Sequence, residues 1–439
     1  MRFLSFLNPS PTTALAKAET QAHSIAILLQ QQDYRSISSL FPRLLQWLFS
    51  PSLLRQGMNA LRLTTGPLLG VGEAMASYGW FGLVRVDVPL RFRWGRMRLV
   101  VRLTRGGTVV AIGIKGLVAG KGWERPAYAG GEVREEYLSL GRWGDRVGAT
   151  LTLPMRQGRF PCVVMMAGSG PCDRDSSVGG LKPFRDIALG LAECGVASLR
   201  FDKVTYTHGL RIKVLQRRFT LTDEYVPHTM DAVRMCLARR DILPDGVFIL
   251  GHSLGGWVAP RLAASEHRIA GCILLAPPAD RLHRCMLRQL RFFASQDEPA
   301  DDPSESLLDK IARQVEVADS SDLSLATPAK DLPMGIGPAY WLDVRKYDAV
   351  ADCEHLRKPL LVMQGGRDYQ VTVEDDYKRF ADRLAGKPDV EMRMYDRCNH
   401  LFVAGQGPST PEEYEKPGNV EEEVVRHIAG WVNDNVQSV

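Results

Sequence analysis

The spacing of hydrophobic positions changes along the first part of the chain. Residues 14–62 carry apolar side chains at helical spacing, interrupted by prolines. Three β-rich stretches with alternating polar positions follow, over residues 80–89, 90–103 and 108–114. Helices followed by an antiparallel meander predict a separate α+β domain, a small unit of helices and a curved sheet, over residues 1–116.

The pattern changes again after a segment rich in glycine, residues 117–134, which we interpret as a linker. Over residues 135–439, short apolar runs alternate with helical patterns, which predicts an α/β fold with a mostly parallel, doubly wound sheet. Residues 277–352 interrupt this alternation between two core strands and contain two helical patterns, over 281–295 and 305–318. Insertions at the carboxyl edge of such a sheet are typically lids or binding walls, so we expect a helical lid.

The strongest local pattern is the pentapeptide Gly251-His-Ser-Leu-Gly255. The apolar run 247–250 precedes it, and a helix-compatible segment, 256–264, follows it. Strand, Gly-x-Ser-x-Gly and helix in this order are typical of a nucleophile elbow, in which a strained turn exposes the serine hydroxyl. A glycine-rich structural turn is the alternative, and the flanking strand and helix favour Ser253 as a nucleophile.

An activated serine needs a histidine base and an orienting carboxylate, each on a loop after a later strand. Asp368 follows the apolar run 359–364, and His400 follows the alternating run 390–395. We therefore predict that Ser253, Asp368 and His400 form a catalytic triad. Asp280 is the main alternative for the acid, because it follows the strand after the elbow.

The negative charge that develops in acyl transfer needs fixed N–H donors. One predicted donor is the backbone of Leu254, directly after the nucleophile. The other is the backbone of Ser169 in the loop after the strand 161–167, where Gly168 and Gly170 allow backbone to approach a substrate closely. The charged residues that follow, 173–175, are expected to brace this loop through ion pairs, with substrate contact as the alternative.

Composition excludes several other classes of protein. The net charge of +5 is small and dispersed over 439 residues, so no nucleic-acid-binding module is expected. The eight cysteines are scattered without a Cys-x-x-Cys pair, which argues against structural zinc and disulfides and favours a reducing, cytoplasmic location. The apolar patch at the N-terminus is too short for a secretory signal, and no run is long enough to span a membrane. No metal and no cofactor are expected.

Residues 135–436 resemble an α/β-hydrolase, and specifically a bacterial esterase and acyl-hydrolase group related to dienelactone hydrolases and serine-aminopeptidase-like hydrolases. The motifs that carry the resemblance are Ala167–Asp175, Arg200–Lys203, Gly251–Gly256, Gln364–Asp368 and Asn399–His400. The chain departs from many relatives in one place, since Ala167 stands where they have histidine before glycine. The first domain resembles cystatin-like or nuclear-transport-factor-like domains, which often form dimers, so a homodimer through residues 1–116 is an expectation.

The resemblance implies a carboxylesterase-type serine hydrolase that acts on small-molecule esters with short or medium acyl chains. A peptidase, a thioesterase or an acyltransferase would use the same triad, and a non-catalytic binding protein with a vestigial triad is the alternative from another class. Within the insertion, Met286, Tyr340 and Trp341 are candidates for the wall of the substrate pocket. The alternative for each of them is packing of the insertion onto the core.

Overall fold

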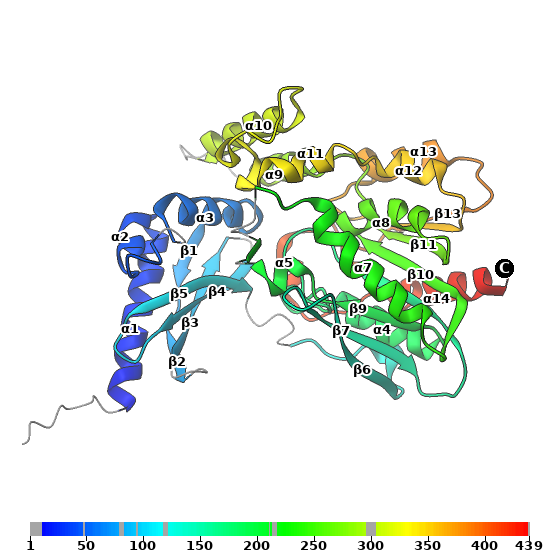
Figure 1. Ribbon diagram of the computed structural model, residues 1–439, viewed down its shortest axis with the longest axis horizontal. Helices are drawn as coiled ribbons and strands as arrows, with labels where there is room; N and C mark the ends of the chain where they lie inside the picture. The colour runs from blue at the N-terminus through cyan, green and yellow to red at the C-terminus, as the bar shows by residue number, and fades with distance from the viewer. Residues whose placement is uncertain are drawn as a thin grey trace, which may run out of the picture. The chain divides into compact units, whose positions relative to one another are not determined.

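The computed structural model divides the chain into two units, Met1–Lys121 with Pro411–Lys416, and Gly122–Thr410 with Pro417–Val439 (Figure 1). The residues that the structure describes are 11–46, 49–78, 83–93, 95–116, 122–209, 211–212, 217–295 and 304–437. Residues 80–82 of the first predicted strand and 117–121 of the predicted linker lie outside them. None of the helices described here is long and apolar enough to cross a membrane.

In its described residues, the N-terminal unit combines three α-helices with a five-stranded antiparallel sheet. Its elements are α1 (Pro11–Gln30), α2 (Tyr34–Ser39), α3 (Pro51–Thr65), β1 (Leu68–Val71), β2 (Met75–Tyr78), β3 (Val84–Phe92), β4 (Gly95–Leu103) and β5 (Val109–Gly116). The strands are ordered β1-β3-β4-β5, and β2 also pairs with β3. The turn Pro411–Glu415 belongs to this unit, where Glu415 accepts the backbone N–H of Arg96 at 3.3 Å.

The structure divides the first two β-rich stretches just before Gly95 rather than between residues 89 and 90. β3 continues through Pro89, which lies opposite Arg98 of β4. The reason is the alternation of buried side chains, which continues without interruption from Val84 to Phe92 and pairs with β4 throughout. The chain therefore turns between Phe92 and Gly95 rather than at the proline.

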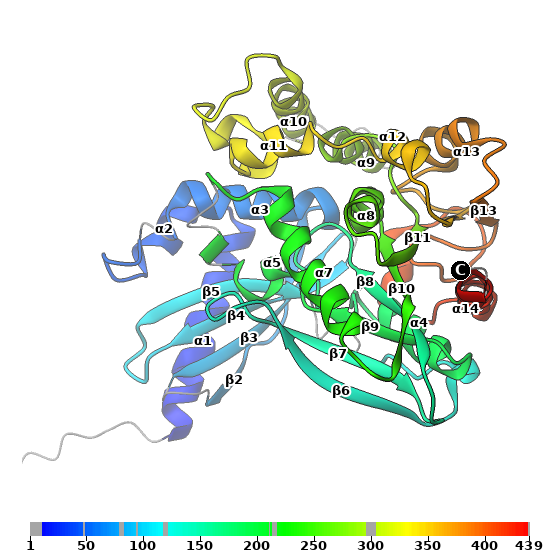
Figure 2. The same ribbon diagram turned by 45° about the vertical axis from the view of Figure 1, so that its right-hand side comes forward.

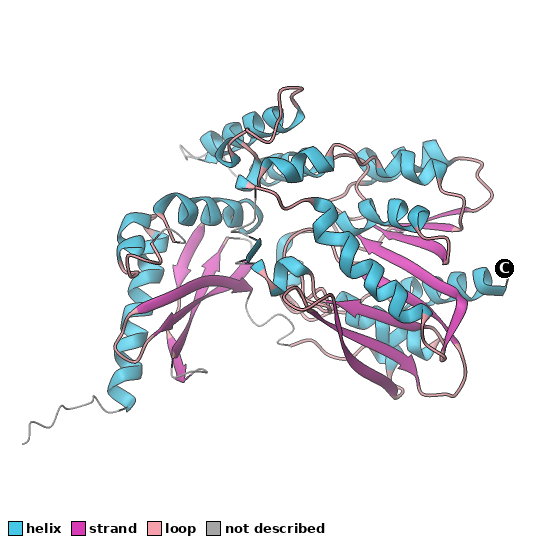
Figure 3. Cartoon of the chain, in the orientation of Figure 1, coloured by secondary structure: helices cyan, strands magenta, loops and turns pink. Residues whose placement is uncertain are grey.

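The C-terminal unit is built around an eight-stranded sheet with the order β13-β12-β11-β10-β8-β9-β7-β6 (Figure 3). Its strands are β6 (Val133–Leu140), β7 (Val147–Pro154), β8 (Phe160–Met166), β9 (Ala197–Phe201), β10 (Ile242–His252), β11 (Ile269–Leu275), β12 (Leu360–Gly365) and β13 (Val390–Tyr395). β7 runs antiparallel to both of its neighbours, and all other neighbouring strands are parallel. The predicted mostly parallel sheet is confirmed.

Helices cover both faces of this sheet (Figure 2). One face packs against α4 (Pro183–Glu193) and α14 (Glu422–Gln437). The other packs against α7 (Leu221–Leu237), α8 (Leu254–Ser265) and α13 (Lys378–Leu384). Strands buried on both faces explain the continuous apolar runs in the sequence, such as the fully buried β8.

The predicted insertion lies between β11 and β12, and its described residues include the α-helices α9 (Leu282–Ser295), α10 (Ser304–Asp319), α11 (Pro338–Val344) and α12 (Ala349–His355). The helical patterns at 281–295 and 305–318 correspond to α9 and α10. α11 and α12 have only seven residues each, which is too short for a helical period to stand out in the sequence.

Candidate active site

The pentapeptide forms a sharp turn between β10, which ends at His252, and α8, which begins at Leu254. Ser253 lies between them with φ 52° and ψ −122°, a backbone conformation that residues other than glycine rarely adopt. A Cβ on Gly251 would lie 2.3 Å from the Gly255 carbonyl oxygen, and one on Gly255 would lie 2.4 Å from that of Met166. The strand, the strained turn and the helix of the predicted elbow are therefore present, and both glycines are required by close backbone contacts.

His400 and Asp368 form a buried pair beyond the carboxyl ends of β13 and β12. The His400 Nδ1 atom lies 2.6 Å from Asp368 Oδ2. Because the carboxylate can only accept, Nδ1–H is the donor, and Nε2 is left to act on another group. The structure brings the predicted acid and base together.

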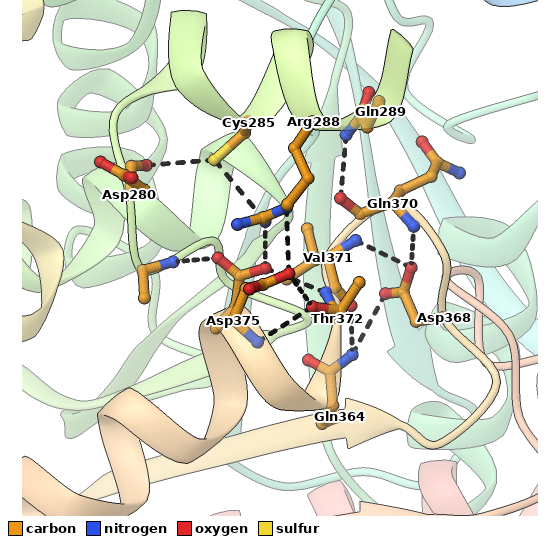
Figure 4. A network of polar contacts seen from close by, with 12 residues as sticks. Asp280, Cys285, Arg288, Gln289, Gln364, Asp368, Gln370, Val371, Thr372 and Asp375 are labelled. Atoms are coloured by element: carbon orange, nitrogen blue, oxygen red, sulfur yellow. Dashed lines mark hydrogen bonds and ion pairs between the residues drawn. The ribbon is translucent and has the colours of Figure 1, made fainter. Parts of the chain in front are cut away.

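Further bonds hold the Asp368 carboxylate in place (Figure 4). Its Oδ1 atom accepts the backbone N–H groups of Gln370 at 2.8 Å and Val371 at 3.0 Å. Its Oδ2 atom accepts the side-chain amide of Gln364 at 3.2 Å. These donors fix the orientation of the carboxylate toward His400.

Asp280, the alternative acid, has other partners. Its Oδ1 atom accepts the N–H of Arg281 at 2.8 Å and lies 3.7 Å from Nη1 of Arg284. Arg281 directly precedes α9 and Arg284 belongs to its first turn. The Asp280 carboxylate is therefore bonded to residues at the beginning of the insertion. The geometry favours Asp368 as the partner of the histidine.

His252 connects the elbow to the His400 loop. Its Nε2 atom donates to the His400 carbonyl oxygen at 2.9 Å, and the two ring centroids are 4.6 Å apart. Burial, reinforced by the nearby His400, lowers the pKa of His252 to about 3, so its ring is neutral. Gly168 also approaches this point, since a Cβ there would lie 3.1 Å from Ser253 Cβ. Ser253, the His400 loop and the loop after β8 therefore meet in one place.

The loop after β8 is held by ion pairs. Arg174 bonds both carboxylate oxygens of Asp202, through Nε at 3.1 Å and Nη2 at 2.8 Å. Asp175 accepts Nε of the buried Arg200 at 2.9 Å, and Arg200 also pairs with Glu135 at 2.7 Å. This is the brace that the charged run 173–175 predicted.

The two predicted oxyanion donors belong to the residue after the serine and to the loop after β8, whose Gly168 approaches Ser253. Leu254 is the first residue of α8, where backbone N–H groups have no partner within the helix. Gly168 is buried, whereas Ser169 and Gly170 are exposed. The local positive end of a helix and an exposed backbone turn next to it suit a developing negative charge.

Comparison with known proteins agrees with this arrangement. Residues 184–415 match the model of the alpha/beta hydrolase family. The chain belongs to the α/β-hydrolase family. A curated relative, Esterase EstD from Thermotoga maritima, is 33% identical over 348 residues, which cover 79% of each chain.

Solved α/β-hydrolase structures are similar to the chain at lower identity. Est1E from Butyrivibrio proteoclasticus has a TM-score of 0.45 and 16% identity, covering 69% of this chain and 99% of that one. A puromycin-hydrolyzing peptidase from Mycobacterium tuberculosis has a TM-score of 0.43 and 16% identity, covering 80% of this chain and 46% of that one.

The insertion of this α/β-hydrolase is attached to the segment after β12 that begins with Asp368 (Figure 4). The sequence did not predict this attachment. Arg288 of α9 pairs with the fully buried Asp376, and Gln289 donates to the Gln370 carbonyl at 3.1 Å. Asp376 also accepts the backbone N–H of Ala279 at 2.8 Å. Burial raises the pKa of Asp376 to about 6 against the opposing effect of Arg288. Arg288 and Asp376 are too far apart in the sequence for any local pattern to pair them.

The predicted pocket residues lie on α9 and α11. Met286 is half-buried, whereas Tyr340 and Trp341 are buried in the cluster that packs the insertion onto the sheet. The Tyr340 hydroxyl donates to Glu224 at 2.8 Å, and Trp341 packs edge-on against His283. These contacts are structural, and contact of the three side chains with a substrate stays a prediction.

Proposed function

We propose that the chain is a serine hydrolase that cleaves carboxylic esters with short or medium acyl groups through an acyl-enzyme intermediate. The observation that carries the proposal is the buried 2.6 Å contact between His400 Nδ1 and Asp368 Oδ2 beside a strained Ser253. The relative that is 33% identical is named an esterase, which supports the ester as the bond that is cleaved.

In the proposed reaction, the Ser253 hydroxyl attacks the ester carbonyl and His400 Nε2 takes the hydroxyl proton. The tetrahedral intermediate collapses, the alcohol leaves with that proton, and the acyl group remains on the serine oxygen. Water then attacks the acyl group while His400 takes a proton from it, and His400 returns that proton to the Ser253 oxygen as the carboxylic acid leaves. Asp368 stabilises the charged imidazole, and the N–H groups of Leu254 and Ser169 bind the oxyanion. No metal or cofactor has a part in this scheme.

The proposal for the first domain is separate. Its helices followed by an antiparallel sheet support the resemblance to cystatin-like or nuclear-transport-factor-like domains. We propose that the protein forms a homodimer through this unit. We also propose that it is a cytoplasmic enzyme related to dienelactone hydrolases. The mass of the protein in solution, measured by light scattering, tests the dimer. A monomeric mass at micromolar concentration would contradict it.

A fluorophosphonate probe tests the central assignment. It should label the wild-type protein on Ser253 and abolish hydrolysis of p-nitrophenyl butyrate, and Ser253→Ala should be neither labelled nor active. Ser265→Ala is the matched control, because it removes an exposed serine hydroxyl at the far end of α8. Wild-type hydrolysis by Ser253→Ala would contradict the proposal. A parallel panel of esters, thioesters and aminoacyl amides separates an esterase from a thioesterase or peptidase.

A further inference from the structure

A buried lysine lies directly beneath the loop that carries the Ser169 donor. Lys203 follows β9 and is 3% exposed, yet its ammonium group has three partners. Nζ donates to the Gly168 carbonyl oxygen at 2.8 Å and to the Tyr225 hydroxyl at 2.9 Å. It also pairs with Glu224 at 2.8 Å. An ammonium group has three N–H bonds, so this site satisfies all of them.

The charge of Lys203 is matched inside the protein. Glu224 of α7 is 6% exposed, and its second oxygen, Oε2, accepts the Tyr340 hydroxyl at 2.8 Å. Burying two ions costs several kcal/mol, and such a pair persists where both ions have full hydrogen bonding, as they do here. Because Tyr340 belongs to α11, the insertion takes part in holding the pair.

The Gly168 carbonyl oxygen is clamped from two sides. Besides Lys203, it lies 2.8 Å from the Tyr225 hydroxyl. Burial raises the pKa of Tyr225 well above its ordinary value, so the hydroxyl keeps its proton and is able to donate. Two donors occupy the two lone pairs of this oxygen, and the peptide group to which it belongs cannot rotate without breaking both bonds.

That peptide group is the one that supplies the predicted oxyanion donor. The Gly168 C=O and the Ser169 N–H belong to one planar peptide unit and point in opposite directions. Fixing the carbonyl toward Lys203 therefore fixes the N–H on the other side. A cation bonded to the oxygen also polarises the peptide unit, which strengthens the N–H as a donor.

We propose that Lys203, held in place by Glu224, is a positioning residue that fixes the N–H of Ser169 in the oxyanion hole. Its role rests on the proposed function, since it acts through the oxyanion hole of that reaction. Lys203 is the last residue of the motif Arg200–Lys203, and no local pattern assigns it a role. The available signal was its position, directly after a strand at the carboxyl edge of the sheet.

The test compares Lys203→Met with Lys358→Met. Lys358 also clamps two backbone carbonyls, those of Glu266 and Ile269, but at the amino end of β11, away from the serine. We expect Lys203→Met to lower kcat for p-nitrophenyl butyrate at least about tenfold per fluorophosphonate-titrated site, with KM changed less than about twofold. Lys358→Met should keep kcat within about twofold of wild type.

The affinity for an inhibitor that forms a tetrahedral adduct is a quantity that general destabilisation of the fold does not change. A trifluoromethyl ketone adds to the serine and places an oxyanion in the hole, so its affinity should fall in parallel with kcat in Lys203→Met. Lys203→Arg, which keeps a cation that can reach the carbonyl, should recover part of both values. Equal kcat and equal ketone affinity in wild type and Lys203→Met would overturn the inference.

Two further variants distinguish the proposed role of Lys203 from an effect of misfolding. Lys203→Met with Glu224→Gln removes both charges and leaves no unpaired buried ion, and it should show the same loss of kcat. Tyr225→Phe removes one neutral donor from the Gly168 carbonyl and should lower kcat about fivefold. Unchanged kcat in these folded variants would also overturn the role of Lys203. Failure of the proposed function looks different, because the wild-type protein itself would then lack labelling at Ser253 and ester hydrolysis.

Discussion

The Nε2 atom of His252 lies 2.9 Å from the carbonyl oxygen of His400. The residue before the nucleophile is therefore bonded to the backbone of the proposed base. Because Nε2–H donates and the ring is neutral, the contact holds the His400 loop against the elbow without adding charge beside the base.

This contact predicts a pH dependence of stability. The pKa of His252 is lowered from 6.5 to about 3 in the folded protein, mainly by burial. Between these values the unfolded chain binds the proton and the folded protein does not, so the free energy of unfolding falls as the pH falls below about 6.5. The contribution is complete above that pH, and about 2 kcal/mol of it is lost between pH 7.5 and pH 5.

His252→Gln isolates this effect, because glutamine keeps an N–H donor and does not titrate. Denaturant unfolding of both proteins at pH 7.5 and pH 5 measures the difference. The wild type should lose more stability than the variant over this range, by about 2 kcal/mol. The same pH dependence in both proteins would show that His252 is not buried in its neutral form.

The choice of Asp368 over Asp280 predicts two different outcomes. Asp368→Asn removes the acceptor that fixes the His400 tautomer, and we expect kcat to fall by about 10⁴-fold. Asp280→Asn removes contacts at the start of α9, and kcat should change by less than about twofold. Steady-state hydrolysis of a p-nitrophenyl ester measures both. A large loss with Asp280→Asn and a small one with Asp368→Asn would reverse the assignment.

The sequence was sufficient to predict the sheet and the places of the site residues, for a physical reason. Parallel strands buried on both faces are continuous apolar runs, and the loops after them meet at one edge. Asp368 follows the continuous apolar run of β12, and His400 follows the alternating run of the edge strand β13, so both were expected at the same edge of the sheet. The elbow was visible because its two glycines are required within five residues.

The contacts around these residues were not predictable from local patterns. Lys203 and Arg288 both pair with carboxylates from other elements. No periodic pattern in the sequence connects either residue with its partner. Pro89 lies within β3, although proline usually marks an edge or an end of a strand. Buried ion pairs and the register of a sheet depend on tertiary packing, which a single sequence does not display.

The elbow predicts unequal effects of two glycine substitutions. Gly255→Ala would place a Cβ 2.4 Å from the Met166 carbonyl oxygen, and we expect the melting temperature to fall by about 6 °C or more. Gly430→Ala is the matched control on α14, where a Cβ meets nothing within 4 Å. It should raise the melting temperature by up to about 2 °C through helix propensity. A Gly255→Ala protein as stable as wild type would contradict the close packing at the elbow.

Attachment of the insertion predicts a difference between two arginines of α9. Arg288→Met leaves Asp376 buried without its cation, and the free energy of unfolding should fall by about 2 to 3 kcal/mol. Arg284→Met removes a half-exposed ion pair with Asp319 and should cost less than about 1 kcal/mol. Denaturant unfolding at pH 8 compares the two. Equal losses would show that the Arg288 contact does not anchor the insertion.

The most direct measurement is the mass of the peptide that contains Ser253 during turnover. The enzyme is mixed with p-nitrophenyl butyrate, quenched in acid within the first turnovers, digested and analysed by mass spectrometry. The proposed mechanism predicts a butyryl group on Ser253 that appears with the burst of p-nitrophenol and disappears when the substrate is exhausted. Steady turnover with no acyl group on Ser253, or with the group on another residue, would contradict it.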